Sequence, residues 1–332
     1  MGKGTVAVVA IVLAIALAGC NGSMHVPGFT SKPLEWTEAV FTKKPAKTYT
    51  VRTHDGVPVE TVIGEPGSYT IKQGDTLIDI ARYYDLGYEE IVEANPGIDP
   101  WVPPVGRQIV LPTSWVLPCC TYEGLVLNIP EMRIFYYQPT SGGLIVRTYP
   151  AGLGRTDRRT PRGKFKVTTK TVNPRWNIPE SIREEHIRER GDARTSIPGG
   201  ADDNPLGKYR IGLSIPKYSI HGTDIPWGTG MLVSHGCTRL YPEDIERLYP
   251  LVAVNAPVEF VYQTVKVGTK RDAVYVEAHR DIYKVGGSAV GDAMTELRKR
   301  GYAANVDRKL VKTAVEGSHG MPFRVGESRR AS

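Results

Sequence analysis

Residues His221 to Leu240 read HGTDIPWGTGMLVSHGCTRL and place a histidine, a cysteine and an arginine in one glycine-rich segment. The runs Lys217–Ile220 and Met231–Ser234 are short, partly apolar and bounded by Pro or Gly, which is typical of β-strands. We expect these two strands to be neighbours in a sheet. Their pairing would bring His221 beside Cys237.

The chemistry of a cysteine explains why this placement matters. A free thiol has a pKa of about 8.5, so a nucleophilic cysteine needs an imidazole or a cation beside it. We interpret Cys237 as the nucleophile and His221 as its base. Gly236 allows a sharp turn before the nucleophile, and the backbone amides of Gly236 and Cys237 are expected to form an oxyanion hole. Pro242 is expected to open a short helix behind the site.

Two other interpretations of the same residues stay open at this point. Cys237 would be a small buried hydrophobic residue if it has no catalytic partner. Alternatively, His221, His235 and Cys237 would bind zinc, but their spacing lacks the usual metal-ligand pair and no fourth ligand is evident. We therefore expect no metal and no cofactor.

The segment resembles the signature of the L,D-transpeptidases, whose YkuD-type catalytic domain has a histidine followed, after a spacer, by Ser/Thr-His-Gly-Cys. DNPLG (203–207), TPRGKF (160–165) and PEDI (242–245) are also similar to segments of that family, especially of its ErfK/YbiS branch. The resemblance implies that Cys237 is the nucleophile, that His221 is the base and that the Gly222 carbonyl orients the imidazole. It further implies that Ser234, His235, Gly236 and Arg239 line the site. Thr238 departs from the family, which usually has an aliphatic residue there.

The N-terminus resembles a lipoprotein signal. Lys3 precedes an apolar run, Val6–Leu17, and then Leu-Ala-Gly-Cys ends at Cys20. The run is too short for a membrane span, which needs about 20 apolar residues. A plain anchor or an ordinary cleaved signal is the alternative. We expect a periplasmic chain lipidated at Cys20, and Asn21 in place of Asp favours the outer over the inner membrane.

The net charge of +7 does not indicate a nucleic-acid partner, because the exported chain has no dense block of Lys and Arg. An anionic envelope polymer is the better partner, and peptidoglycan stems and anionic lipids both qualify. Solvated surface charge without a specific partner is the alternative. Three cysteines remain once Cys20 is acylated. Cys119 and Cys120 are either a vicinal disulfide or two free thiols in a linker, and the sequence does not choose between them.

Residues 68–112 predict a small βααβ unit. A strand at Tyr69–Ile71 is followed by a helix capped by Asp75 or Thr76, and then by a helix at Tyr88–Ala94 and a strand at Gln108–Leu111. This unit resembles the LysM module, which binds N-acetylglucosamine chains such as glycan strands. A small packing domain without sugar binding is the alternative.

The region after residue 121 begins with four strand-like runs, at 125–129, 133–137, 144–149 and 164–169. Residues 173–205 then form a charged insertion with a helix predicted at Glu180–Arg190. A long excursion before a catalytic segment is typical of a lid. Arg175 and Trp176 in this insertion, and Trp227 between the two halves of the signature, are candidate contacts for substrate. A solvated surface loop without substrate contact is the alternative for all three residues.

The predicted fold is mainly β, with a β-sandwich-like catalytic domain that carries a lid insertion and follows a small βααβ LysM-like domain. We expect a linker at 113–121, a strand at 274–277 and a helix at 290–300, and we expect the last fifteen residues to be disordered. The predicted boundaries are a signal peptide at 1–20, a tether with an N-terminal strand at 21–65, the LysM-like domain at 66–113, the L,D-transpeptidase catalytic domain at 121–264 and a C-terminal extension at 265–332.

The resemblance implies an enzyme that acts on peptidoglycan stem peptides and glycan strands. Cys237 would attack the carbonyl of the third stem residue, form a thioester and pass the acyl group to an amine. The amine is another stem, which gives a 3,3 crosslink, or a lysine of an outer-membrane lipoprotein. Carbapenems would acylate Cys237. An L,D-carboxypeptidase, a general cysteine hydrolase and a non-catalytic peptidoglycan-binding lipoprotein are the alternatives.

Overall fold

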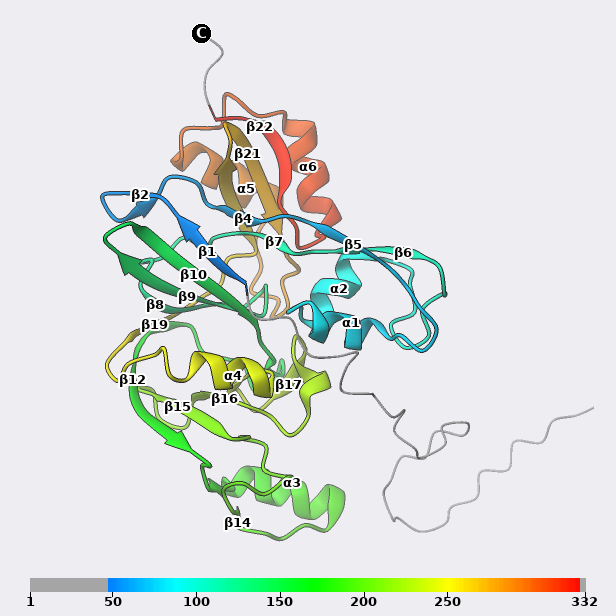
Figure 1. Ribbon diagram of the computed structural model, residues 1–332, viewed down its shortest axis with the longest axis vertical. Coiled ribbons are helices and arrows are strands. Elements are labelled where there is room, and N and C mark those ends of the chain that lie inside the picture. Colours follow the sequence, from blue (N-terminus) through cyan, green and yellow to red (C-terminus); the bar gives the residue numbers. More distant parts are fainter. Residues whose placement is uncertain (1–46, 329–332) are drawn as a thin grey trace, which may run out of the picture.

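The computed structural model describes residues 47–328, so the predicted signal peptide, Cys20 and most of the tether lie outside the described residues. The chain is mainly β, as expected (Figure 1). Its largest element is a nine-stranded sheet. The strands of this sheet, in spatial order, are β1 (Thr48–Val51), β10 (Gly143–Pro150), β9 (Arg133–Thr140), β8 (Gly124–Asn128), β19 (Pro257–Val261), β12 (Gly163–Val172), β15 (Tyr209–Leu213), β16 (Ser219–His221) and β18 (Thr238–Arg239).

Strand β12 joins the two halves of this sheet. Its first part, from Gly163 to Lys166, pairs with β19, and its second part, from Val167 to Val172, pairs with β15. A register irregularity between Val167 and Thr169 marks the change. Strands that pass from one layer to another at such a bulge build sandwich corners. The two halves enclose one apolar core, which agrees with the predicted sandwich-like fold.

Two strands of the sheet are buried on both faces. Leu125 and Leu127 on β8 point into the core between the two halves, whereas Val126 points into a second core. Successive side chains of a strand alternate between faces, so this second core lies on the opposite side of the sheet. Strand β9 repeats the pattern with Ile134 in the first core and Phe135 in the second. A strand with both faces covered needs a continuous apolar run, and GLVLN provides it.

The LysM-like unit covers this second face. It consists of β5 (Gly67–Thr70), α1 (Leu77–Tyr83), α2 (Tyr88–Ala94) and β6 (Gln108–Leu111), in the predicted order. Thr76 caps α1 by accepting a hydrogen bond from the Asp79 amide. Apolar residues of the unit share one core with the sheet. The unit is therefore a fixed layer of the protein, and Figure 1 shows it beside the sheet.

A buried ion pair fastens this layer to the sheet. The Arg133 guanidinium on β9, whose side chain is 0% exposed, lies 2.6 Å from the Glu90 carboxylate on α2. The Trp115 indole donates to Glu90 over 3.0 Å, and Arg133 stacks over the Trp115 ring with 4.3 Å to its centroid. Arg133 also donates to the carbonyl of Asp85 over 2.8 Å. Glu90, Trp115 and Arg133, which are far apart in the sequence, thus meet at the Arg133 guanidinium.

A second set of contacts joins the LysM-like unit to the active-site half. Arg82 on α1 makes two hydrogen bonds to the carboxylate of Glu243, in helix α4 (Pro242–Leu248). The backbone amide of Tyr88, at the start of α2, donates to the carbonyl of Thr229 over 3.2 Å. Gly230 packs so closely here that a Cβ on it would lie 2.4 Å from the Gly87 backbone.

The segment predicted to be a linker is structured, and that prediction was wrong. Residues 114–116 form β7 (Ser114–Val116), which pairs with β4 (Val62–Gly64). Trp115, Val116 and Leu117 are buried. The proline and cysteine content of the segment concealed a strand whose partner is distant in sequence. Nearby, β2 (Thr53–His54) and β3 (Val57–Pro58) form a short hairpin.

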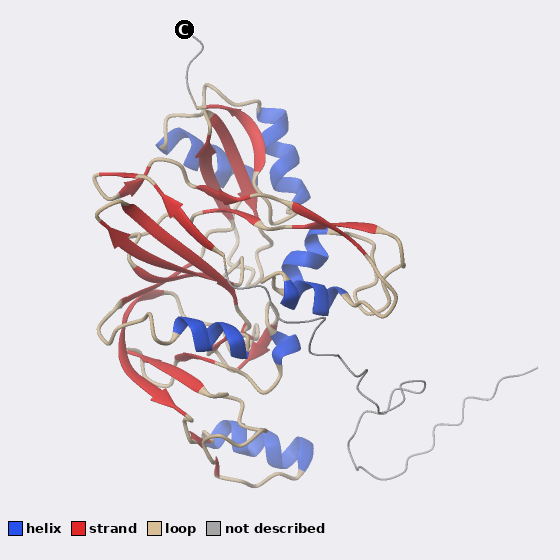
Figure 2. Ribbon diagram, in the orientation of Figure 1, coloured by secondary structure: helices blue, strands red, loops and turns tan. Residues whose placement is uncertain are grey.

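The C-terminal extension folds as a separate layer (Figure 2). Strands β20 (Val265–Lys270), β21 (Ala273–Ala278) and β22 (Phe323–Glu327) form a sheet that packs against α5 (Ala289–Lys299) and α6 (Arg308–Gly317). The predicted strand at 274–277 and helix at 290–300 are thus confirmed. The predicted disorder of the last fifteen residues was wrong for residues 323–327, because pairing with β21 orders them.

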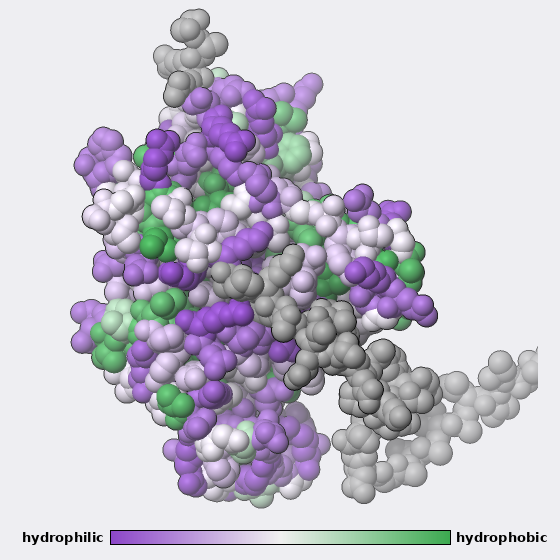
Figure 3. Space-filling model, viewed as in Figure 1, coloured by the Kyte–Doolittle hydropathy of each residue, from purple (hydrophilic) through white to green (hydrophobic). Residues whose placement is uncertain are grey.

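The charged insertion forms a small lobe. Strands β13 (Trp176–Asn177) and β14 (Ser196–Ile197) pair beside α3 (Glu180–Arg190), which matches the predicted helix. A minor apolar cluster of Ile178, Ile182 and Ile197 holds the lobe together. The lobe lies at the bottom of Figure 3, where its surface is mostly hydrophilic. No helix within residues 47–328 is long and apolar enough to span a membrane.

We predict that Glu90→Gln lowers the free energy of unfolding by about 3–5 kcal/mol, because it leaves the Arg133 charge buried without its partner. Chemical denaturation followed by tryptophan fluorescence measures this change. Glu296→Gln is the matched control, since Glu296 pairs with Lys299 on the surface of α5 and its loss should cost less than about 1 kcal/mol. Equal effects of the two substitutions would contradict the assigned role of the buried pair.

Candidate active site

The strand that carries the histidine pairs differently from the sequence-based expectation. Strand β16, which ends at His221, does not pair with the Met231–Ser234 run. It pairs in parallel with β18, so that Ile220 faces Thr238 and His221 faces Arg239. The Met231–Ser234 run contains β17 (Leu232–Ser234), which pairs instead with β11 (Leu153–Gly154). The expected pairing was wrong because the two-residue strand after Cys237 gave no visible sequence pattern.

The observed pairing still brings the two reactive side chains to one place. Cys237 directly precedes β18, and its Sγ lies 3.8 Å from Ser219 Oγ and 3.5 Å from the Lys217 carbonyl. Both Cys237 and His221 line one cavity of about 730 Å³. The thiol is half-buried and the imidazole is 3% exposed. The geometry therefore places a buried imidazole and an accessible thiol in the wall of one cavity.

The turn before Cys237 depends on a glycine. Gly236 has a φ of +113°, and a Cβ there would lie 2.7 Å from a ring carbon of Tyr218. The Gly236 amide, which we expected at the oxyanion hole, instead donates to Ser234 Oγ over 3.0 Å. Ser234 Oγ in turn donates to the Cys237 carbonyl over 2.6 Å, and Thr160 Oγ1 donates to the Gly236 carbonyl over 3.0 Å. Two hydroxyl groups thus fix the backbone that carries the thiol.

Burial sets the protonation state of His221. Its Nδ1 lies 2.7 Å from the Gly222 carbonyl, which can only accept a hydrogen bond, so Nδ1 carries the proton. Desolvation, followed by the charge of Arg239, lowers the pKa of His221 to about 3. The imidazole is therefore neutral at physiological pH, and Nε2 is the nitrogen that carries a lone pair and no proton. This is the state that a base must have before it accepts a proton.

The cavity gathers most of the candidate substrate contacts. Arg175 and Trp176 of the lid line it together with Ser234, His235 and Arg239. Trp227 does not line it. This residue lies in the 3₁₀ turn η1 (Pro226–Gly228), which contacts α1, and it is 56% exposed. The roles of these side chains stay predictions.

The small lobe that contains α3, predicted above to be a lid, contacts the signature segment through charged side chains. Glu185 on α3 lies 2.9 Å from His235 Nε2 and 3.2 Å from the Arg155 guanidinium. The hydrogen bond with His235 is the main cause that lowers the pKa of Glu185 to about 2. Glu185 has no distinctive signal in the sequence, because charged residues occupy most of α3. Tyr218 has none either, and Thr160 stands out only as part of the TPRGKF segment, because the fold alone brings these two residues to the turn.

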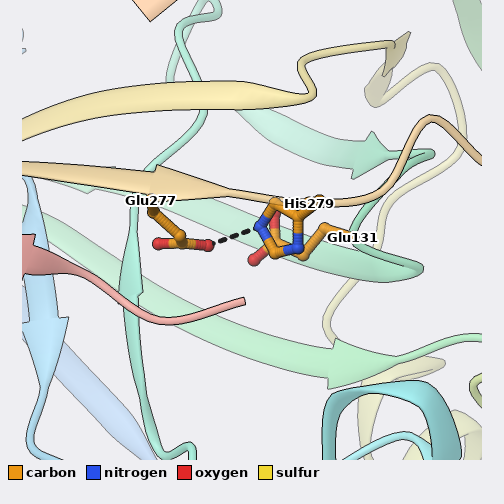
Figure 4. Close-up of side chains that lie close together, drawn as sticks. All are labelled: Glu131, Glu277 and His279. Carbon is orange, nitrogen blue, oxygen red and sulfur yellow. Dashed lines mark hydrogen bonds and ion pairs between the residues drawn. The ribbon is translucent and has the colours of Figure 1, made fainter. Parts of the chain in front are cut away.

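One group of side chains has the composition of a metal site, and it lies outside this cavity. Glu131, Glu277 and His279 come together in the interior, where His279 bonds to Glu277 over 2.7 Å (Figure 4). The Lys266 ammonium lies 2.6 Å from Glu131 and 2.8 Å from Glu277. This ammonium occupies the position of a cation between the carboxylates. The cluster therefore ties the C-terminal layer to the sheet.

Cys119 and Cys120 are free thiols in the structure. Cys119 is exposed, and burial raises the pKa of Cys120 to about 12. Cys120 is therefore unreactive at neutral pH. Cys237 is the cysteine that combines access with a neighbouring imidazole.

Comparison with known proteins identifies two domains. Residues 123–260 match the family of the L,D-transpeptidase catalytic domain, YkuD, and residues 69–112 match the LysM domain. "Probable L,D-transpeptidase YbiS" of Escherichia coli is 32% identical over 274 residues, which cover 80% of this chain and 88% of that protein. "Probable L,D-transpeptidase ErfK/SrfK" of Escherichia coli is 31% identical over 279 residues, which cover 81% of this chain and 89% of that protein.

A solved structure, the catalytic domain of the E. faecium L,D-transpeptidase, aligns with a TM-score of 0.30 and 18% identity over 42% of this chain and 96% of that chain. The family assignment rests on the sequence relatives, which match this chain over most of their length. The chain therefore belongs to the L,D-transpeptidase family and is an enzyme of that family, with a LysM domain packed against its YkuD-type catalytic domain.

Proposed function

We propose that this L,D-transpeptidase acts through a thioester on Cys237, with His221 as the base. The observation that carries the proposal is the pairing of β16 with β18, which puts the neutral His221 imidazole and the Cys237 thiol in one cavity wall. A neutral imidazole with Nδ1 bonded to the Gly222 carbonyl presents Nε2 as the proton acceptor. The thiol needs such a partner to become a nucleophile.

The reaction follows in two balanced steps. In the first, Nε2 of His221 takes the thiol proton while Sγ attacks the carbonyl of the third stem residue. The C–N bond to the following D-residue breaks, and the imidazolium returns its proton to the leaving amine. In the second step an acceptor amine attacks the thioester carbonyl, His221 takes its proton, and the C–S bond breaks as the thiolate leaves and takes that proton from the imidazolium. The enzyme is then regenerated.

The tetrahedral oxyanion needs a hydrogen-bond donor close to Cys237. The Gly236 amide already donates its hydrogen bond to Ser234 Oγ, so we assign the stabilisation of the oxyanion to the Cys237 amide. The Ser234 and Thr160 hydroxyl groups hold that amide in place through the neighbouring carbonyls. The oxyanion site is thus built on a turn that is rigid before substrate binds.

We also propose that the enzyme works in the periplasm, attached to the outer membrane by a lipid on Cys20. The Leu-Ala-Gly-Cys sequence after an apolar run and the Asn that follows it support this location. Peptidoglycan lies in that compartment, and the LysM domain supports contact with its glycan strands. Stem peptides, or a lysine of an outer-membrane lipoprotein, are the proposed acyl acceptors.

We predict that Cys237→Ala abolishes acyl-enzyme formation. Intact mass spectrometry of the protein mixed with a disaccharide-tetrapeptide, or with a carbapenem, should show an adduct on the wild type and none on Cys237→Ala. Cys119→Ala is the matched control, because Cys119 is an exposed free thiol that does not line the cavity. It should keep the adduct. Transfer of the adduct to an added amine would distinguish a transpeptidase from a hydrolase, whose adduct is lost to water alone.

We predict that the acylation rate shows no inflection near pH 6.5 that depends on His221. Since the pKa of His221 is lowered to about 3, the base form persists through mildly acidic pH. His221→Gln should slow acylation by about 10²- to 10⁴-fold at every pH. Single-turnover rates measured between about pH 5 and 8, a range centred near the ordinary imidazole pKa, test this prediction. A tenfold loss per pH unit below 6.5 in the wild type would refute the buried neutral base.

We predict that the full chain fractionates with membranes and that Cys20→Ser releases it into the soluble fraction. The lipid is the reason, since acyl chains bind bilayers through burial of their CH₂ groups. Labelling with a radioactive fatty acid and immunoblotting of separated inner and outer membranes measure both claims. A Cys20→Ser protein that stays with the membrane would overturn the anchor.

A further inference from the structure

The active-site cavity has a strongly unbalanced charge. Six cationic side chains line it, whereas Asp157 is the one carboxylate in its lining among the described residues. The cations are Arg158, Arg159, Arg175, Arg210, Lys217 and Arg239. Asp157 lies 3.4 Å from Arg155 and 4.0 Å from Arg158, so it is already shared by two arginines. The other five cations of the lining form no ion pair within 4 Å among residues 47–328.

Arg239 is the most unusual of these cations. The Arg239 side chain is half-buried in the cavity wall, and its Nε is buried and has no hydrogen-bond partner within residues 47–328. Burial lowers the pKa of Arg239, and the charge of Asp224 offsets part of this effect. Buried charges in proteins are normally paired, because an unpaired one pays the full cost of desolvation. An anion that arrives with the substrate would supply the missing partner.

The cations surround the thiol from different elements. Arg239 is on β18, two residues after Cys237, and it faces His221 in the strand pairing. Arg210 on β15 faces His221 from the other side. Lys217, which precedes β16, and Arg175, which belongs to the insertion at 173–205, line the same cavity. A bound peptide would therefore meet positive charge on several sides of its reacting carbonyl.

We propose that this cavity selects stem peptides whose carboxyl groups are free and discriminates against stems in which a carboxyl group is amidated. Arg239 is the main residue that binds the free carboxylate. This inference rests on the proposed function and deepens it by naming the substrate class. Guanidinium groups bind carboxylates through two parallel hydrogen bonds, and an amide offers a single acceptor oxygen and no charge. Amidation therefore removes the partner that the buried cation lacks.

The first test compares turnover of two tetrapeptide stems that differ only in amidation of one carboxyl group. The full-length protein in detergent is supplied with each stem and with the same amine acceptor, and kcat/KM is measured at low salt. We expect about a 10- to 100-fold preference for the free acid, the loss typical of a missing hydrogen bond to a charged group. The preference should shrink as salt is raised. Equal kcat/KM values for the two stems would overturn the proposal.

Variants of the cavity locate the discrimination. Arg239→Gln should bring the ratio of kcat/KM for the free stem to kcat/KM for the amidated stem close to one, whatever the substitution does to the chemical step common to both stems. Lys217→Gln provides a second variant that is expected to fold, since Lys217 is exposed, and it should lose part of the preference. Arg147→Gln is the matched control, because Arg147 on β10 bonds to Gln138 and does not line the cavity. An unchanged preference in both cavity variants would overturn the assignment.

A binding measurement separates this inference from the proposed function. Calorimetric titration of full-length Cys237→Ala with each stem needs no turnover. If Cys237→Ala binds the free stem more tightly than the amidated stem while the wild type forms no adduct, the proposed selectivity stands and the proposed thioester chemistry is rejected. Equal binding, together with normal turnover of both stems by the wild type, would keep the chemistry and reject the selectivity.

Discussion

The buried pair of Arg133 and Glu90 is the contact on which the arrangement of this protein depends. The guanidinium on β9 bonds to α2 of the LysM domain and stacks on Trp115, which belongs to the strand between the two domains. A fully buried arginine is tolerated only when every side of it finds an acceptor or a ring face. This requirement gives the LysM domain one fixed position on the sheet, in contrast to a module on a flexible tether.

The fixed position of the LysM domain extends to the catalytic segment. In the loop before β17, the carbonyls of Thr229 and Gly230 accept hydrogen bonds from the first backbone amides of α2. Arg82 donates a hydrogen bond to Glu243 at the start of α4. These contacts lie at both ends of the segment that holds Cys237. Any glycan strand that the LysM domain binds would therefore be held in a defined position relative to the thiol.

Arg239 links the chemistry of the base to recognition of the substrate. After burial, its charge is the next cause of the low pKa of His221. The same side chain lines the cavity that holds Cys237, so a substrate carboxylate bound to it would lie in the cavity with both reacting groups.

The sequence by itself determined the local elements and the family signature. Helical spacing and caps predicted α1, α2, α3 and α5, and the signature from His221 to Arg239 marked the segment that carries the thiol and the imidazole. These features are local, because turn residues, strand alternation and helix periodicity depend on neighbours along the chain. Tertiary structure decided what pairs with what. The partner of β16, the strand β7 inside the expected linker, and the bond between Glu185 and His235 join residues that are far apart in the sequence and leave no local pattern. Burial decided the charge of His221, because desolvation depends on the atoms that the whole fold packs around the ring.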